Sequence, residues 1–95
     1  EQRLPFAFRI AGASPASGNV RLSLDQPAPG AATVEVFDVR GARVRTLING
    51  ALAAGRHALS WDGRRENGGA APAGMYLVRA RSGAASHTLR VAFLR

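Results

Sequence analysis

Cysteine and lysine are both absent from the 95-residue sequence, in which all thirteen basic residues are arginine. Without cysteine there are no disulfides, thiolate metal sites or cysteine nucleophiles. Long apolar runs are also missing: 46% of the residues are hydrophobic, but none of the runs approaches the ~20 residues of a membrane-spanning helix. Residues 1–5 lack the basic and apolar regions of a secretory signal, so we expect any export signal to lie upstream.

Acidic residues are few. Six of them oppose the thirteen arginines and leave a formal charge of +7. A basic chain favours nucleic acid, acidic glycans or anionic lipid through non-specific electrostatics. Here the arginines are dispersed from Arg3 to Arg95, and Arg64-Arg65 is the one adjacent pair. Because no aromatic residues interleave a basic patch, nucleic acid is not an expected partner.

What is present is a series of short alternating segments, separated by Gly, Pro, Asn and Asp at intervals of roughly ten residues. The expected strands cover residues 6–10, 19–25, 33–39, 42–48, 57–61, 75–81 and 87–94. This pattern predicts an all-β fold, a seven-stranded antiparallel immunoglobulin-like β-sandwich. We expect residues 1–95 to form a single domain, in which residues 1–14 are the lead-in and first strand.

Alternation also predicts the core, because every second side chain of a strand points to the same face. The inward side chains are expected to be Phe6, Phe8, Ile10, Val20, Leu22, Leu24, Val34, Val36, His57, Leu59, Trp61, Tyr76, Val78, Ala80, Leu89, Val91 and Phe93. The two strands on either side of Arg40-Gly41 should pair as a hairpin. Val44 and Leu47 are spaced by three, which predicts a bulge near Arg45. Asn49-Gly50 predicts a turn, and we expect a loop over residues 51–55 to follow it.

Four short motifs punctuate the chain: D-x-x-G, A-G-x-H, W-D-G and G-x-Y. Their structural residues are Asp38, Gly41, Gly55, Trp61, Asp62, Gly63, Gly74 and Tyr76. Gly41 is expected to supply a positive φ in the hairpin and Gly55 a tight turn. Asp62 has a side-chain oxygen that can hold the backbone of the following loop.

In order and spacing, these motifs resemble the FlgD-type immunoglobulin-like domains and the related type A C-terminal sorting domains of the type IX secretion system. The resemblance covers residues 15–95. It implies a C-terminal sorting module of a larger exported bacterial protein, located outside the cell or on its surface. The implied partners are the outer-membrane secretion machinery and an upstream catalytic or adhesive domain in the same chain, and no cofactor is implied.

Sorting domains of this family end on a basic residue, a few apolar residues and a terminal basic residue. The corresponding segment here is Arg90 to Arg95. By this resemblance, the partner-binding residues are Arg90, Phe93, Leu94 and Arg95. A terminal strand with an accessible backbone and flanking charges is also suited to β-augmentation.

No catalytic residues are predicted. The two histidines, His57 and His87, are expected to face inward at strand ends, and no G-x-S-x-G motif surrounds a serine. Asp62, Glu66 and Asn67 offer oxygens to a calcium ion, but their spacing is not that of an EF-hand loop, so a polar turn is the favoured interpretation.

Three alternative functions stay open: a carbohydrate-binding module, a spacer in an extracellular hydrolase, and a hook-cap-type assembly domain. Sugar binding generally requires exposed aromatic rings, whereas Trp61 and Tyr76 are expected in the core. The outward pairs Arg43/Arg45 and Arg79/Arg81 would form a basic stripe if their strands were neighbours. Such a stripe is either a solvated face or a contact for anionic surface glycolipid.

Overall fold

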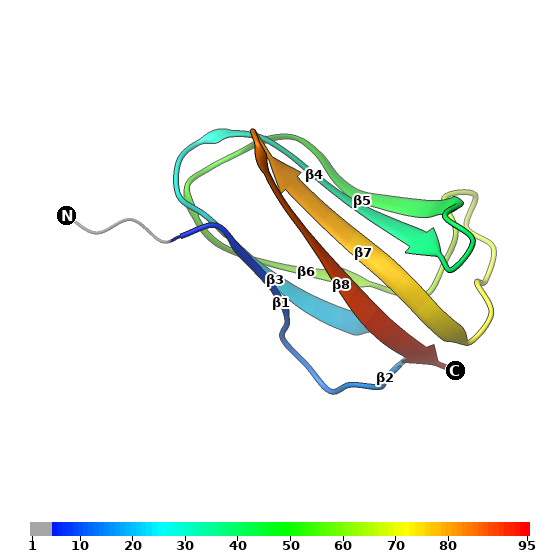
Figure 1. The fold of residues 1–95 in the computed structure, drawn as a ribbon. Helices are drawn as coiled ribbons and strands as arrows, with labels where there is room; N and C mark the ends of the chain where they lie inside the picture. Colours follow the sequence, from blue (N-terminus) through cyan, green and yellow to red (C-terminus); the bar gives the residue numbers. More distant parts are fainter. Residues whose placement is uncertain (1–4) are drawn as a thin grey trace.

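The computed structural model describes residues 5–95, which form eight β-strands and no helix (Figure 1). The strands are β1 (Ala7–Ile10), β2 (Ala16–Ser17), β3 (Val20–Gln26), β4 (Gly30–Asp38), β5 (Arg43–Leu52), β6 (Gly55–Trp61), β7 (Gly74–Ser82) and β8 (Ala85–Leu94). The all-β prediction is therefore confirmed. A helix that could span a membrane is not found in this part of the chain.

The strands form two sheets, a smaller one in the order β1-β3-β6 and a larger one in the order β2-β8-β7-β4-β5 (Figure 1). Every neighbouring pair is antiparallel except β2 and β8, which run parallel through Ala16 and Ser17. The prediction of seven antiparallel strands is thus wrong in number and direction. β2 was missed because a two-residue strand inside a Pro/Gly-rich segment carries no alternation.

The core lies between the sheets and is made by the alternating apolar side chains. Its buried members are Phe8, Ala16, Val20, Leu22, Leu24, Val34, Val36, Val44, Trp61, Ala71, Tyr76, Val78, Ala80, Val91 and Phe93. One strand departs from simple alternation: on β3, the outward-facing Ser23 and Asp25 are buried as well as the inward-facing residues, which include Gln26. β3 is the central strand of its sheet, so its outward side chains are covered from both sides, by β1 and β6.

The β4–β5 hairpin is confirmed, and it contains the expected irregularity. The register between the two strands shifts twice, which leaves Leu47 and Val44 of β5 without a directly opposed residue. The expected turn at Asn49-Gly50 is wrong, because these residues pair with Thr33 and Ala32 inside the strand. Pairing with β4 outweighs their local turn preference, so the expected loop over 51–55 shrinks to two residues between β5 and β6.

The two histidines lie on the inner faces of their sheets, as expected: His57 is paired with the buried Leu24, and His87 with the buried Ala80. His87 is nevertheless exposed. His57 is half-buried, and its Nε2 lies 2.7 Å from the carbonyl oxygen of Ala53.

Candidate interaction surface

The D-x-x-G motif is a turn that is closed by its own aspartate. The Asp38 Oδ1 atom accepts hydrogen bonds from the backbone N–H groups of Arg40 and Ala42, at 2.9 and 3.0 Å. Gly41 has a φ of 87°, a conformation that glycine adopts without a steric cost. The carboxylate is therefore occupied in holding the hairpin.

The W-D-G and G-x-Y motifs meet in the core through their aromatic rings. Trp61 is fully buried, and its ring centroid lies 4.8 Å from that of Tyr76 and 5.2 Å from that of Phe93. The Trp61 Nε1–H donates to the Arg64 carbonyl at 2.9 Å, and the Tyr76 hydroxyl donates to the Pro72 carbonyl. Neither ring is available to stack on a sugar, so these residues give no support to the carbohydrate-binding alternative.

The loop after Trp61 closes over Phe93 because residue 63 is glycine. Gly63 has a φ of 77°, and a Cβ added to it would lie 2.1 Å from the Cζ atom of the Phe93 ring. Asp62 holds the same loop, since its Oδ1 accepts a hydrogen bond from the Arg64 N–H at 3.0 Å. In the W-D-G motif, Trp61 thus supplies a ring to the core, Asp62 holds the backbone of the loop, and Gly63 lets the loop approach the Phe93 ring closely.

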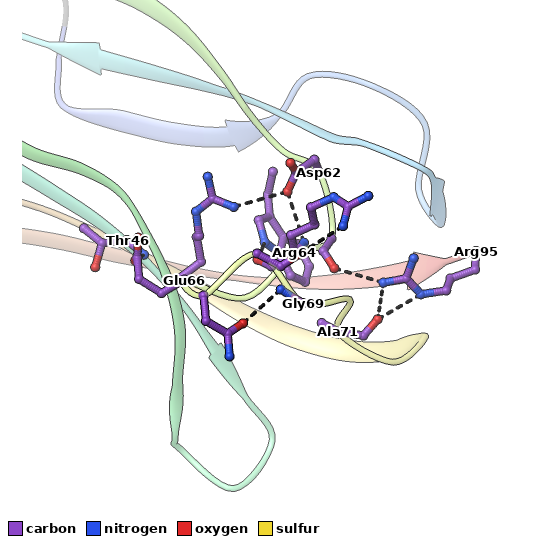
Figure 2. Close-up of polar contacts among 12 residues, drawn as sticks. Thr46, Asp62, Arg64, Glu66, Gly69, Ala71 and Arg95 are labelled. Atoms are coloured by element: carbon purple, nitrogen blue, oxygen red, sulfur yellow. Dashed lines mark hydrogen bonds and ion pairs between the residues drawn. The ribbon is translucent and has the colours of Figure 1, made fainter.

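The side chain of Arg95 also contacts this loop (Figure 2). Its Nε–H donates to the Ala71 carbonyl at 2.9 Å, and its Nη2 donates to the Gly63 carbonyl at 3.0 Å and again to Ala71. Its guanidinium also lies 5.2 Å from the centre of the Phe93 ring. The side chain therefore fastens the end of β8 to the loop.

The side-chain oxygens that could have been calcium ligands accept hydrogen bonds from donors within the protein (Figure 2). Glu66 Oε1 accepts from the Thr46 N–H at 2.9 Å, and Asn67 Oδ1 accepts from the Gly69 N–H at 2.9 Å. Asp62 Oδ1 also accepts from Arg45, at 3.4 Å. Among residues 5–95 there is no group of three or more His, Asp or Glu side chains that could hold a metal ion. The contacts are those of a polar turn.

Glu66 also fixes the loop to β5, which is an edge strand of the larger sheet. Its backbone N–H donates to the Val44 carbonyl at 3.0 Å, while its carboxylate binds the Thr46 N–H. These two β5 groups flank Arg45, near the bulge. The loop therefore covers part of a sheet edge that would otherwise be open to pairing with another chain.

The four residues predicted to bind a partner are in different environments. Phe93 is only 1% exposed and belongs to the core, so its side chain is not accessible in this fold. Arg95 is engaged with the loop. Arg90 is exposed, and Leu94 is 46% exposed. Arg95 is exposed as well, but its guanidinium is held by the loop, so Arg90 and Leu94 are the two whose exposed side chains are not engaged in this way. Their role in binding stays a prediction.

Arg90 and Leu94 lie on the outer face of the larger sheet beside apolar side chains that the sequence did not mark. Leu77 is paired with Arg90 and Met75 with Ala92, so these four share a face, and alternation along β8 places Leu94 on it too. We name this surface the Met75 patch; its members are Val39, Met75, Leu77, Arg90, Ala92 and Leu94. Val39, Met75, Leu77 and Arg90 line a groove of about 340 Å³.

An acidic residue lies between the outward arginines of β5 and those of β7. β4 lies between β5 and β7, and its Glu35 accepts from Arg43 at 3.3 Å and from Arg79 at 3.1 Å. Burial of this carboxyl, which is 8% exposed, would raise its pKa, but the two guanidinium groups outweigh burial and lower the pKa below its ordinary value. The condition for a basic stripe, that the two strands be neighbours, is therefore not met.

A second buried carboxylate neutralises arginines on the smaller sheet. Asp25, which is 3% exposed, pairs with Arg56 at 3.0 Å and with Arg9 at 3.1 Å. The hydrogen bond from Arg56 lowers the pKa of Asp25; burial opposes this effect and the hydrogen bond from Arg9 reinforces it. With Asp62 paired to Arg45, the ion pairs of residues 5–95 involve five arginines. One of these, Arg79, lies two residues along β7 from Leu77 of the Met75 patch and on the same face.

Three arginines near the Met75 patch form no ion pair within the described residues. Arg90 lines its groove, and Arg40 and Arg65 line an adjoining hollow that shares Val39 and Met75 with it. The surface is therefore apolar at its centre and positive at its rim.

Comparison with known proteins gives a consistent set of relatives. The family described as "FlgD Ig-like domain" matches residues 7–86. The basal-body rod modification protein FlgD of Escherichia coli (strain K12) is 43% identical over 53 residues, which are 56% of this chain and 23% of that protein. In fold, FlgD from P. aeruginosa superposes with a TM-score of 0.62 at 28% identity, over 78% of this chain and 57% of that one.

A further structure, titled as FlgD from Xanthomonas campestris with insights into the hook capping essential for flagellar assembly, has a TM-score of 0.61 at 29% identity. It is matched over 79% of this chain and 55% of its own length. The chain thus spans less than two thirds of each of these relatives. All three are named FlgD, the Xanthomonas campestris title refers to hook capping in flagellar assembly, and none is named as an enzyme.

These relatives overturn several expectations. The sorting-module function, the outer-membrane secretion partners and export across the outer membrane as a sorting domain all depended on the type IX half of the resemblance, which none of these relatives supports. The hydrolase spacer and the carbohydrate-binding module are unsupported for the same reason. The motifs were ambiguous because they are fold-forming residues, and a fold alone does not distinguish a sorting role from an assembly role.

Proposed function

Because this chain belongs to the FlgD Ig-like domain family, we propose that it is a non-catalytic assembly domain of a longer, hook-capping flagellar protein. The observation that supports this most is the family match over residues 7–86, which runs from the first residue of β1 into β8 and so includes both sheets. Of the alternatives that the sequence left open, the hook-cap-type domain is the one that agrees with the relatives.

We propose further that residues 1–95 form one immunoglobulin-like domain, with residues 1–14 as its lead-in and first strand. The two facing sheets are those of an immunoglobulin-like sandwich to which the short parallel strand β2 is added. The remaining parts of the longer protein would lie elsewhere in its chain, as they do in relatives of which this chain matches 23 to 57%. The proposed location is the flagellar hook.

A non-catalytic role is supported by the way the polar residues are used. Asp38 and Asp62 cap turns, Glu66 holds a loop on β5, and Asp25 and Glu35 neutralise arginines. Within the described residues neither histidine hydrogen-bonds a carboxylate or a serine. The surface that remains is suited to contact with another protein rather than to chemistry.

The test is to locate the parent protein in its own bacterium. Immunogold labelling of a tagged parent protein should mark the ends of growing hooks, and deletion of residues 7–94 should abolish hook formation without abolishing synthesis of the protein. Labelling that is spread over the cell surface, with normal hooks in the deletion strain, would contradict the proposal. A Gly68→Ala variant, altered at a solvent-facing turn, is the matched control and should build hooks.

A further inference from the structure

We propose that the Met75 patch is the surface through which this domain binds the flagellar hook subunit, by way of an acidic region of that subunit. The identity of the partner rests on the proposed function above. The location and chemistry of the surface rest on the patch itself.

The first argument is the concentration of exposed apolar side chains. Among residues 5–95, the large hydrophobic side chains classed as exposed are Val39 at 71%, Met75 at 42% and Leu94 at 46%, and all three belong to the patch. Single exposed apolar residues are ordinary, but a contiguous group with a polar rim marks an interaction site. Methionine is also enriched in protein interfaces, where its unbranched side chain adapts to different partners.

The second argument is charge. Arg90 lies at the groove, and Arg40 and Arg65 lie around the adjoining hollow. Asp38 lines the same hollow, so the rim carries three arginines and one carboxylate. The rim is therefore positive on balance, and carboxylates of a partner would complement it. A net charge of +7 makes a second copy of this chain a poor occupant, because the two copies would repel each other.

The third argument separates a protein from other acidic partners. Nucleic-acid surfaces usually combine basic groups with aromatic rings for stacking, whereas the Met75 patch has an aliphatic centre, and Trp61 and Tyr76 are buried. An aliphatic centre inside an arginine rim is the arrangement of a protein–protein interface, in which apolar anchors contribute affinity and charges contribute orientation and association rate.

The experiment measures binding of purified hook subunit from the same bacterium to the immobilised 95-residue chain. The test variants are Met75→Ser, Leu94→Ser and Arg90→Glu. The matched control is Arg81→Glu, which makes the same charge change at an exposed β7 residue, six positions from Met75 or roughly 20 Å along the strand. All variants alter exposed side chains, so each should retain the wild-type urea unfolding midpoint, which is measured first.

We expect Met75→Ser and Leu94→Ser each to weaken binding about fivefold and Arg90→Glu about tenfold, with about twofold or less for Arg81→Glu. Binding should also weaken as salt concentration rises. Equal losses in Arg90→Glu and Arg81→Glu would overturn the inference, because they would indicate diffuse electrostatics. Unchanged affinity in both serine variants would also overturn it, while leaving the assembly function in place.

Absence of binding by the wild-type chain would overturn the inference as well, and the immunogold experiment would still decide the proposed function independently. Duplex DNA and phosphatidylglycerol vesicles serve as comparison probes. If either one binds more tightly than the hook subunit, and Met75→Ser removes that binding, the patch belongs to a different class of partner and the proposal is wrong.

Discussion

The Phe93 ring occupies the space in which residue 63 would place a Cβ, since that atom would lie 2.1 Å from the ring Cζ. Gly63 also has a φ of 77°, which side-chain-bearing residues rarely adopt. We therefore expect Gly63→Ala to lower the free energy of unfolding by about 3 kcal/mol, from backbone strain and overpacking together. The measurement is urea unfolding followed by Trp61 fluorescence.

Gly68 provides the control for this prediction. Its φ is 88°, but an added Cβ would have no heavy atom within 4 Å. Gly68→Ala should therefore lower the free energy of unfolding by backbone strain alone, about 1 kcal/mol. Equal unfolding midpoints for the two variants would show that the contact between Gly63 and Phe93 has no energetic weight.

The aromatic cluster should dominate the stability of so small a domain. Trp61 is fully buried between Tyr76 and Phe93, and its removal leaves a large cavity. We expect Trp61→Ala to cost on the order of 3–5 kcal/mol, enough to unfold much of the population at room temperature. Circular dichroism and the dispersion of the amide proton signals measure how much of the population is unfolded. A folded Trp61→Ala variant with a near-wild-type midpoint would contradict this role.

The parts of the fold that could be predicted from sequence are those that side-chain alternation determines. Val20, Leu22 and Leu24 are inward because a strand repeats every two residues, and this periodicity is visible without a structure. The β5 bulge could be predicted for the same reason, since the spacing of Val44 and Leu47 departs from the period.

What could not be predicted depends on neighbours that are distant in sequence. Asp25 lies on the outward face of β3 and is buried because Arg56 of β6 and Arg9 of β1 fold over it. Alternation places Phe93 in the core, whereas the family resemblance implies that it binds a partner; the structure agrees with alternation, since Phe93 is 1% exposed. The Met75 patch was missed because Val39 and Met75 belong to different hairpins and come together only through the larger sheet.

The buried Gln26 is a second feature without a sequence signal, and it joins the two sheets at one end. Its Nε2 donates to the carbonyls of Leu52 at 2.9 Å and Gly30 at 3.3 Å, and its Oε1 accepts from the Ser82 hydroxyl at 2.8 Å. Gln26→Leu should destabilise the domain by about 1–3 kcal/mol, because it leaves buried polar groups unpaired. Urea unfolding of Gln26→Leu, Ser82→Ala and the double variant measures the coupling; additive effects would contradict the shared hydrogen bond.

Stability should depend on pH through Asp25. The hydrogen bond from Arg56 lowers the pKa of Asp25 below its ordinary value of 3.8, against the opposing effect of burial, whereas in the unfolded chain the pKa is ordinary. Between these two pKa values the unfolded state binds more protons, so the unfolding free energy rises with pH. The stabilisation is complete above about pH 5 and is lost as the pH falls through the folded-state pKa.

The lowered pKa of Glu35 acts in the same direction, so removal of Asp25 should reduce the pH dependence without abolishing it. Urea midpoints of the wild type and Asp25→Asn, measured from about pH 5 down to about pH 2.5, test this prediction. We expect a steeper fall for the wild type. Parallel curves would show that Asp25 titrates alike in the folded and unfolded states.

Arg95 allows the structural and partner-binding interpretations of the last strand to be separated. Its guanidinium fastens β8 to the carbonyls of Gly63 and Ala71, so Arg95→Ala should lower the unfolding free energy by about 1 kcal/mol. Arg95→Lys should recover only part of this loss, because an ammonium group lacks the planar fork that reaches two carbonyls.

Binding of the hook subunit is then compared in the same variants. If Arg95 acts only as a fastener, Arg95→Ala should bind nearly as well as the wild type under conditions in which both are folded, whereas Arg90→Glu should not. The opposite result, an unchanged urea midpoint with lost binding, would assign Arg95 to the partner contact that its position at the end of β8 first suggested. In that case the surface would extend beyond the Met75 patch to the loop around Gly63.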